Sequence, residues 1–303
     1  SGPVKLISQI YSLIGLNAPG VMLRMISTLL FAIEILLVMT FISGYPRSKM
    51  QYYITSLSFI LIPFYSSGYS KELLVSIAIT IITVTLSKLQ IRRIVFFPIL
   101  SLTIAITVRS YYFLTVVFYF FCLIMLSKIS SPFKRAFLIL VALSTFITFE
   151  YQTKFLFSHT GVNILTIRQN SQSYLKVAAR SQIESSNISG DLMQNFISLT
   201  RTVLSMIFPF NRIEISPYFI FASVLNLTVW VLILQALAMK RVSMGVPKLE
   251  TASFLLAFTM TATFFEVDAG SFVRHLFPYF SFSLLLFQTK DFQANRLNLY
   301  NEK

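Results

Sequence analysis

Residues 111–127 read YYFLTVVFYFFCLIMLS, seventeen consecutive positions without a charged side chain. Apolar residues fill this stretch continuously instead of alternating with polar ones, a pattern that favours a helix in apolar surroundings. At a rise of about 1.5 Å per residue, such a helix approaches the thickness of a bilayer's hydrocarbon core, which is about 30 Å. The stretch therefore predicts a membrane-spanning helix.

Similar apolar runs recur along the whole chain of 303 residues. Hydrophobic residues make up 55% of it and charged residues 12%, against roughly 25% charged in a typical soluble domain. So few charges cannot cover a water-exposed surface, which predicts an all-α, polytopic transmembrane helical bundle that forms a single integral membrane domain over residues 1–303. About nine spans are predicted, at residues 21–43, 51–66, 72–87, 94–108, 111–127, 136–151, 218–239, 253–265 and 272–287.

The charges are mostly positive, with 25 Lys and Arg against 11 Asp and Glu, a net charge of +14. In a soluble protein this excess would indicate nucleic acid, but membrane topology explains most of it here, so no nucleic-acid partner is expected. Fourteen cations fall in alternate short loops and the C-terminal tail, which the positive-inside rule makes cytoplasmic. They are Arg47, Lys49, Lys88, Arg92, Arg93, Lys128, Lys134, Arg135, Lys240, Arg241, Lys248, Lys290, Arg296 and Lys303.

This orientation puts the N-terminus outside. Because no signal peptide is apparent, a further helix is expected before this sequence. The orientation also makes the long polar segment 152–216 extracytoplasmic. Within it, residues 199–210 are apolar but too few to span, so they predict a short re-entrant or interfacial helix.

Four outer segments each bring a cation close to the membrane surface, and three of them add a carboxylate. They carry Lys71 with Glu72, Arg109, Arg212 with Glu214, and Arg274 with Glu266 and Asp268. A planar guanidinium binds phosphate through two parallel hydrogen bonds, and a neighbouring carboxylate or imidazole can accept a proton from a hydroxyl. The combination is suited to glycosyl transfer from a lipid diphosphate, with cations stabilising the leaving group and no metal or other cofactor required.

Simpler interpretations of these residues remain open. Cations at helix ends commonly anchor a span at the interface, and Glu72 could merely complement the positive end of a helix. His275 could be structural. Glu266 and Asp268 could chelate a divalent metal, although nearby cations would compete for their oxygens.

Several enzyme classes are excluded by missing motifs. The chain has no Gly-x-x-x-x-Gly-Lys-[Ser/Thr], His-Glu-x-x-His or Gly-x-Ser-x-Gly sequence, which argues against a P-loop ATPase, a zinc protease and an α/β-hydrolase. The single cysteine, Cys122, excludes a disulfide framework. No predicted cytoplasmic loop is long enough for a sugar-nucleotide domain, so a sugar donor would have to be lipid-linked.

Four motifs in order resemble those of the Wzy-type (EpsG-like) polymerases of bacterial O-antigen, capsular and exopolysaccharide repeat units. They are SKE at 70–72, VRSYY at 108–112, FPF at 208–210 followed by Arg212 and Glu214, and DAGSFVRHLFP at 268–278. The last is the most specific, being similar to a D-x-G-[ST]-x-x-R-H-x-x-P pattern in the family's penultimate outer loop. Those polymerases are usually longer, with ten or more spans.

The resemblance implies a C-type membrane glycosyltransferase in the bacterial inner membrane, with its active site facing the periplasm. It would join undecaprenyl-diphosphate-linked oligosaccharide repeats and work with a chain-length regulator protein. His275 is the preferred base, with Glu72 and Asp268 as rivals, because an imidazole beside a cation is largely neutral near pH 7. The residues expected around the diphosphate and the glycan are Lys71, Arg109, Arg274, Arg212, Arg168, Arg180, Glu214, Tyr111 and Tyr112.

Other classes stay as alternatives. A different lipid-linked glycosyltransferase or a glycan ligase would share the outer cluster and differ only in its acceptor. A polysaccharide flippase would need charges along a path through the membrane, and the predicted spans contain few apart from Glu34 and Arg24. A membrane O-acyltransferase would usually meet its acyl donor from the cytoplasmic side, whereas the polar cluster is predicted outside.

Overall fold

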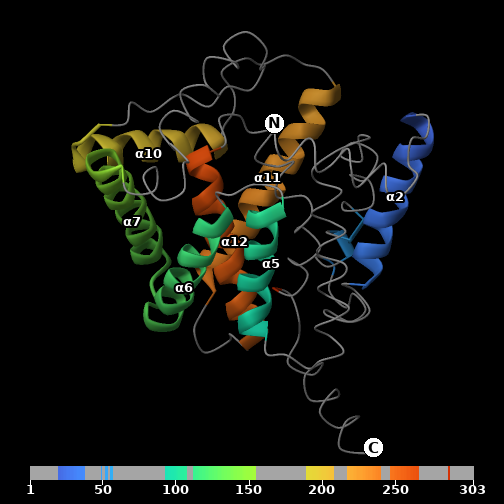
Figure 1. The fold of residues 1–303 in the computed structure, drawn as a ribbon, viewed down its shortest axis with the longest axis horizontal. Coiled ribbons are helices and arrows are strands. Elements are labelled where there is room, and N and C mark those ends of the chain that lie inside the picture. The colour runs from blue at the N-terminus through green and yellow to red at the C-terminus, as the bar shows by residue number, and fades with distance from the viewer. Residues whose placement is uncertain are drawn as a thin grey trace, which may run out of the picture. The chain divides into compact units, whose positions relative to one another are not determined.

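A computed structural model describes residues 20–37, 49, 52–53, 55–56, 93–107, 112–154, 189–207, 217–239, 246–265 and 286. Within these residues the secondary structure is helical and contains no strand (Figure 1). The helices are α2 (Gly20–Leu37), α5 (Arg93–Thr107), α6 (Phe113–Lys128), α7 (Pro132–Thr153), α10 (Leu192–Ile207), α11 (Pro217–Ala238) and α12 (Val246–Phe265). The all-α prediction is thus confirmed for the described part of the chain.

Six of the nine predicted spans coincide with a helix, namely α2, α5, α6, α7, α11 and α12. The runs at 51–66, 72–87 and 272–287 lie almost wholly outside the described residues. Among the residues that are described, one helix, α7, is both long and apolar enough to cross a membrane. The number of spans therefore stays a prediction.

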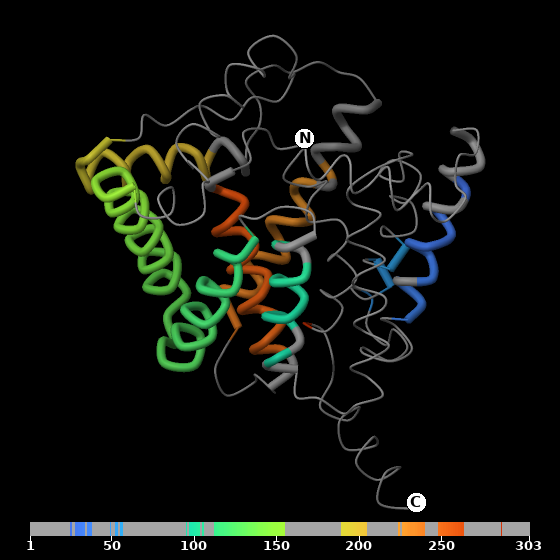
Figure 2. Tube along the Cα trace, viewed as in Figure 1, coloured from blue at the N-terminus to red at the C-terminus, as the bar shows by residue number. Residues whose placement is uncertain are grey.

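The chain divides into two compact units. One comprises Ser1–Val116, Met244–Ala252 and Leu276–Lys303, and the other comprises Val117–Ser243 and Ser253–His275. The second unit includes α7, α10 and α11, and the helices of this unit are traced in green to orange in Figure 2. The prediction of a single integral membrane domain for the whole chain is untested.

Helix α7 begins and ends with well-defined caps. The Ser131 side chain accepts a 3.4 Å hydrogen bond from the backbone N–H of Lys134, and Pro132 occupies the first turn, where its missing N–H costs nothing. At the other end Lys154 adopts a left-handed conformation with φ of 49°, and its N–H donates to the carbonyl of Glu150 at 2.8 Å. These caps fix α7 at Pro132–Thr153. The helix therefore begins four residues before the predicted apolar run 136–151.

Arg135, in the first turn of α7, joins the ends of two other helices. Its Nη1 donates to the carbonyls of Leu237 and Met239 at 2.6 and 2.7 Å, at the end of α11. Its Nε donates to the carbonyl of Ile129 at 2.7 Å and its Nη2 to that of Leu126 at 3.4 Å, at the end of α6. The residue is 0% exposed. Arg135 therefore has a structural role that counting it as a loop cation missed.

Replacing Arg135 should destabilise the protein strongly. Arg135→Ala removes four hydrogen bonds to a charged donor, each worth about 1.5–3 kcal/mol, and leaves buried carbonyls without this partner. We expect a clear fall in the midpoint of thermal unfolding of the detergent-solubilised protein. Arg135→Lys should be intermediate, because an ammonium cannot reproduce the planar fork.

Lys134→Ala is the matched control, because Lys134 is the adjacent cation and is exposed. Its unfolding midpoint should equal that of the wild type. An Arg135→Ala protein as stable as the Lys134→Ala protein would contradict the structural role.

Candidate functional site

Of the residues predicted to form the site, the structure describes Tyr112. It is buried, at 5% exposed, immediately before α6, and a contact with substrate stays a prediction. The other predicted residues lie outside the described part of the chain: His275, Glu72, Asp268, Lys71, Arg109, Arg274, Arg212, Arg168, Arg180, Glu214 and Tyr111. Their convergence is untested.

The described part of the predicted extracytoplasmic segment centres on α10. Asp191 caps this helix, since its Oδ1 accepts a 2.9 Å hydrogen bond from the N–H of Met193 and its carbonyl accepts a 3.1 Å bond from the N–H of Asn195. Ser189 Oγ in turn accepts the N–H of Asp191 at 3.1 Å. This cap starts α10 at Leu192, seven residues before the predicted apolar segment 199–210. Residues 208–210 lie outside the described ranges.

Asn195 attaches α10 to α7. The residue is 1% exposed, and its Nδ2 donates both to Thr148 Oγ1 of α7 at 2.9 Å and to the carbonyl of Ser189 at 2.7 Å. Its Oδ1 accepts the N–H of Ser189 at 3.0 Å. Thr148 Oγ1 itself donates to the carbonyl of Ser144 at 2.9 Å. The amide of Asn195 is thus fully engaged as a donor, which fixes the turn before α10 against the last two turns of α7.

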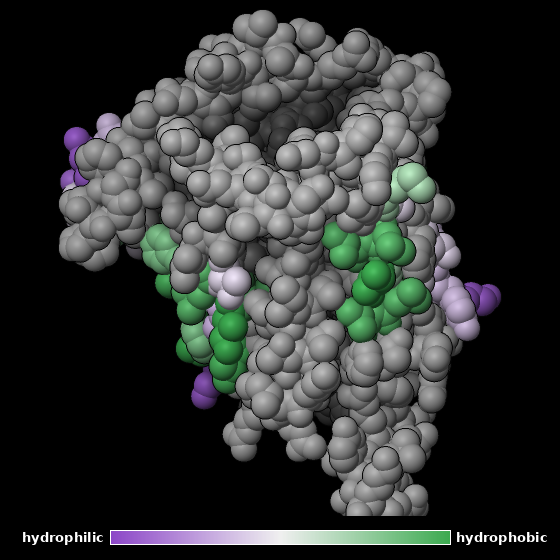
Figure 3. All heavy atoms as spheres, turned by 45° about the vertical axis from the view of Figure 1, so that its right-hand side comes forward, coloured by the Kyte–Doolittle hydropathy of each residue, from purple (hydrophilic) through white to green (hydrophobic). Residues whose placement is uncertain are grey.

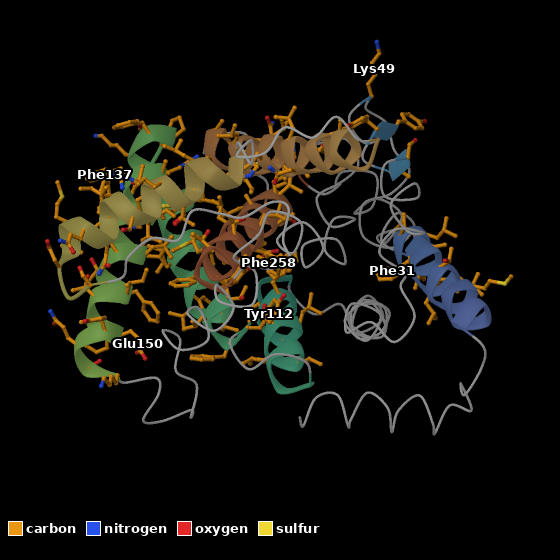
Figure 4. All side chains as sticks on the ribbon, turned by 90° about the horizontal axis from the view of Figure 1, so that it is seen from above. Phe31, Lys49, Tyr112, Phe137, Glu150 and Phe258 are labelled. Atoms are coloured by element: carbon orange, nitrogen blue, oxygen red, sulfur yellow. The ribbon has the colours of Figure 1, made fainter. Side chains whose placement is uncertain are left out.

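Two further contacts continue this junction. Gln152 Nε2 donates to the carbonyl of Gly190 at 3.3 Å. The rings of Phe137 on α7 and Phe196 on α10 pack in a tilted arrangement, with centroids 5.9 Å apart. Phe137 and Glu150 lie towards opposite ends of α7 (Figure 4), and α10 lies across one end of α7 in Figure 1.

The side of α10 that faces away from α7 is exposed and mostly apolar. Met193 is 64% exposed, Leu204 52% and Ile197 44%, and Arg201 and Gln194 are exposed beside them. The opposite side of the helix buries Asn195, Leu199 and Thr202. Helix α10 therefore buries the polar side chains of Asn195 and Thr202 while it exposes Met193, Ile197 and Leu204, whereas a surface helix of a water-soluble protein usually buries its apolar side chains.

Glu150 is a buried carboxylate near the C-terminal end of α7, the end that also carries Thr148 and Gln152. It is 5% exposed and lies between Thr148 and Gln152 in sequence. Glu150 is not among the predicted site residues, although an acidic residue inside an apolar run is a recognisable signal of a polar site. Glu34 carries the same signal, but its side chain lies outside the described part. Nothing in the sequence alone singles out Asn195, because its importance depends on α7.

The described residues contain no group of three or more His, Cys, Asp and Glu side chains able to hold a metal. Glu266, Asp268 and His275 are not among those residues, so metal binding by the predicted site stays untested.

Cys122 is buried, with its Sγ 3.6 Å from Met260 Sδ. The α7–α10 junction can position the chain between α7 and α11 through polar contacts. Its polar groups are the hydroxyls of Thr148 and Ser189, the carboxylate of Asp191 and the amides of Asn195 and Gln152.

No protein-family model, curated protein or solved structure matches this chain.

The contact between Asn195 and Thr148 can be tested by crosslinking. Because Asn195 Nδ2 lies 2.9 Å from Thr148 Oγ1, the two thiols of the double variant Thr148→Cys/Asn195→Cys should be joined by a short bifunctional methanethiosulfonate reagent. Cys122 can stay in place, since it is buried. Formation of the crosslink is measured as a mobility shift after proteolysis between the two positions, reversed by reductant.

Thr148→Cys/Gln194→Cys is the control, because Gln194 is exposed and points away from α7. It should crosslink much less. Equal crosslinking of the two pairs would mean that α10 does not pack on α7 through Asn195.

Proposed function

We propose that this chain is a membrane-embedded glycosyltransferase that polymerises lipid-diphosphate-linked oligosaccharide repeats on the outer face of the bacterial inner membrane, as a Wzy-type polymerase would. The observation that carries the proposal is the ordered set of outer motifs, above all DAGSFVRHLFP at 268–278. The natural lipid carrier is undecaprenyl diphosphate, and a chain-length regulator is the expected protein partner.

A membrane location is supported by the distribution of side chains on α11. Its exposed side presents the apolar residues Val224, Leu227, Val231 and Leu234 together with Gln235, while Asn226 and Thr228 are buried. In water this arrangement would leave a long apolar stripe unshielded, whereas in lipid it places polar groups where protein partners can satisfy them. Green patches of exposed apolar side chains recur on the face drawn in Figure 3.

The ends of α7 support the same location. Phe133 and Phe137 are exposed near its start, and Phe149 and Tyr151 near its end. Aromatic side chains at both ends of an apolar helix are typical of spans, because their rings are suited to the two interfaces, most clearly for the amphipathic ring of tyrosine. The helix between them is the one described helix that meets the length and hydropathy of a span.

The proposed reaction is displacement at an anomeric carbon. A hydroxyl of the acceptor glycan attacks this carbon of the donor sugar, and the bond from the carbon to the diphosphate oxygen breaks. The lipid diphosphate leaves with the electron pair, and the hydroxyl proton passes to a base, His275 in preference to Glu72 or Asp268. Lys71, Arg109 and Arg274 would stabilise the leaving diphosphate as its charge develops.

Arg109→Ala and Arg274→Ala should each abolish polymerisation. Losing a cation that stabilises the leaving diphosphate costs roughly 100- to 1,000-fold in rate, by analogy with the loss of one donor to a developing oxyanion. The assay is turnover of a purified lipid-diphosphate repeat by purified protein, with the product resolved as a ladder. Lys128→Ala serves as the control, because Lys128 is an exposed cation that the positive-inside rule predicts to be on the inner side.

Ladders of normal length from both arginine variants would overturn the site assignment. A protein that moves the lipid-linked repeat across vesicles without extending it would favour the flippase alternative. A single addition without a ladder would favour a ligase or another glycosyltransferase.

Polymerisation should not depend on a divalent metal, because guanidinium and ammonium groups supply the positive charge at the leaving group. Ladder synthesis is therefore expected to be unchanged by EDTA. Loss of the ladder with EDTA and its return with Mg²⁺ or Mn²⁺ would instead assign Glu266 and Asp268 as metal ligands.

A further inference from the structure

Helix α10 has three distinct sides. One side, with Asn195, Leu199 and Thr202, is buried. The second carries the exposed apolar residues Met193, Ile197 and Leu204, which recur at helical spacing and so share one edge. The third carries the exposed polar residues Gln194 and Arg201, which also share an edge because they are seven positions apart.

The apolar edge of α10 is continuous with exposed apolar surface on α7. Phe196 lies on α10 between the buried side and the apolar edge, since it is three residues after Met193 and one before Ile197. Its ring packs on that of Phe137, which is itself 50% exposed on α7. The Met193–Ile197–Leu204 edge and Phe137 are therefore neighbouring apolar surfaces, and both are best matched by an apolar medium.

The polar edge fits the boundary of that medium. Arg201 is the one cation on α10, and it is exposed next to the apolar edge. A guanidinium in this position matches lipid phosphates in charge and geometry. Its aliphatic stem can lie along the apolar surface while its head reaches the phosphates.

We propose that α10 lies in the plane of the membrane interface and binds phospholipid along its exposed side. Met193, Ile197 and Leu204 insert among the acyl chains, and Arg201 binds headgroup phosphates. The polar contacts of Asn195 and Gln152 hold the helix in this orientation on α7. A helix with one apolar edge and one polar edge is the form that interfacial helices take. Helix α10 thereby anchors the segment between α7 and α11 to lipid, whatever reaction the protein performs.

The test uses single cysteines at positions 193, 197, 204 and 194, each carrying a nitroxide, in the full chain reconstituted into phosphatidylethanolamine–phosphatidylglycerol vesicles. Cys122 is left in place because it is buried. Collision rates are measured with oxygen, which concentrates in lipid, and with a water-soluble nickel chelate. Labels at 193, 197 and 204 should collide mainly with oxygen, and the label at 194 mainly with nickel.

Arg201 is tested in the same vesicles with the label at 197. Arg201→Glu should move this label towards water, which appears as a lower ratio of oxygen to nickel collisions, and Arg201→Lys should largely preserve the ratio. All four positions are exposed, so labelling them leaves the fold intact, and a monodisperse elution profile verifies this.

Nickel collisions at 193, 197 and 204 as frequent as at 194 would overturn the proposal, since the apolar edge would then face water. Labels at these positions that neither reagent reaches would also overturn it, because protein would then cover the edge. An unchanged ratio of oxygen to nickel collisions in Arg201→Glu would show that Arg201 does not bind headgroup phosphates. The measurement needs no enzymatic turnover, so its failure is distinct from failure of the proposed function.

Discussion

The guanidinium of Arg135 fixes three helix ends relative to one another. The last carbonyls of a helix lack partners within it, and they carry the negative end of the helix dipole. Arg135 satisfies such carbonyls at the ends of α6 and α11 from the first turn of α7. A cation there is favoured by both helix dipoles, and the planar fork supplies donors in two directions. Because the start of α7 is fixed in this way, its far end presents Thr148 and Gln152 to α10 at a defined position.

Hydroxyl side chains show how the helices tolerate polar residues in apolar surroundings. Each donates to the carbonyl four residues earlier in its own helix, so it needs no partner on another helix. Such bonds, all between 2.7 and 3.0 Å, are made by Ser144, Thr148, Thr153, Thr200, Thr202, Thr228, Thr259, Thr261 and Thr263. Asn195 differs, because its amide donates between helices. Specificity of packing therefore rests on a few residues such as Asn195 and Arg135.

Continuous apolar runs predicted the existence of six helices but placed several of their starts too late. Helix α7 starts at Pro132 because Ser131 and Pro132 form a cap, and α12 starts at Val246 although Lys248 and Glu250 interrupt the apolar run. Hydropathy registers the apolar centre of a helix and not its capped, polar first turn. The same reason explains why α10 is longer than its apolar part. Of the predicted site residues, Tyr112 is the one within the described part of the chain, so the predicted cluster stays a prediction.

Arg135 and Asn195 were missed for a different reason. Their roles depend on backbone carbonyls and hydroxyls from distant parts of the chain, at Leu237 and Thr148, and no local pattern encodes such partners. A loop cation and a structural cation look identical in sequence. Burial separates them: Arg135 is enclosed, whereas its neighbour Lys134 is exposed.

This distinction sharpens the argument from charge. Removing Arg135 from the inner cations leaves thirteen of the fourteen on that side, so the proposed topology does not depend on it. On the predicted outer side, the proposed lipid contact of Arg201 accounts for one cation of segment 152–216 without a substrate. The cations for which the proposed function supplies a ligand are Lys71, Arg109, Arg212 and Arg274. In the proposed site these cations would repel one another wherever water is scarce, and the carboxylates beside them in sequence would offset part of that repulsion. A lipid diphosphate would offset the rest, so the proposed substrate matches the charge of the proposed site.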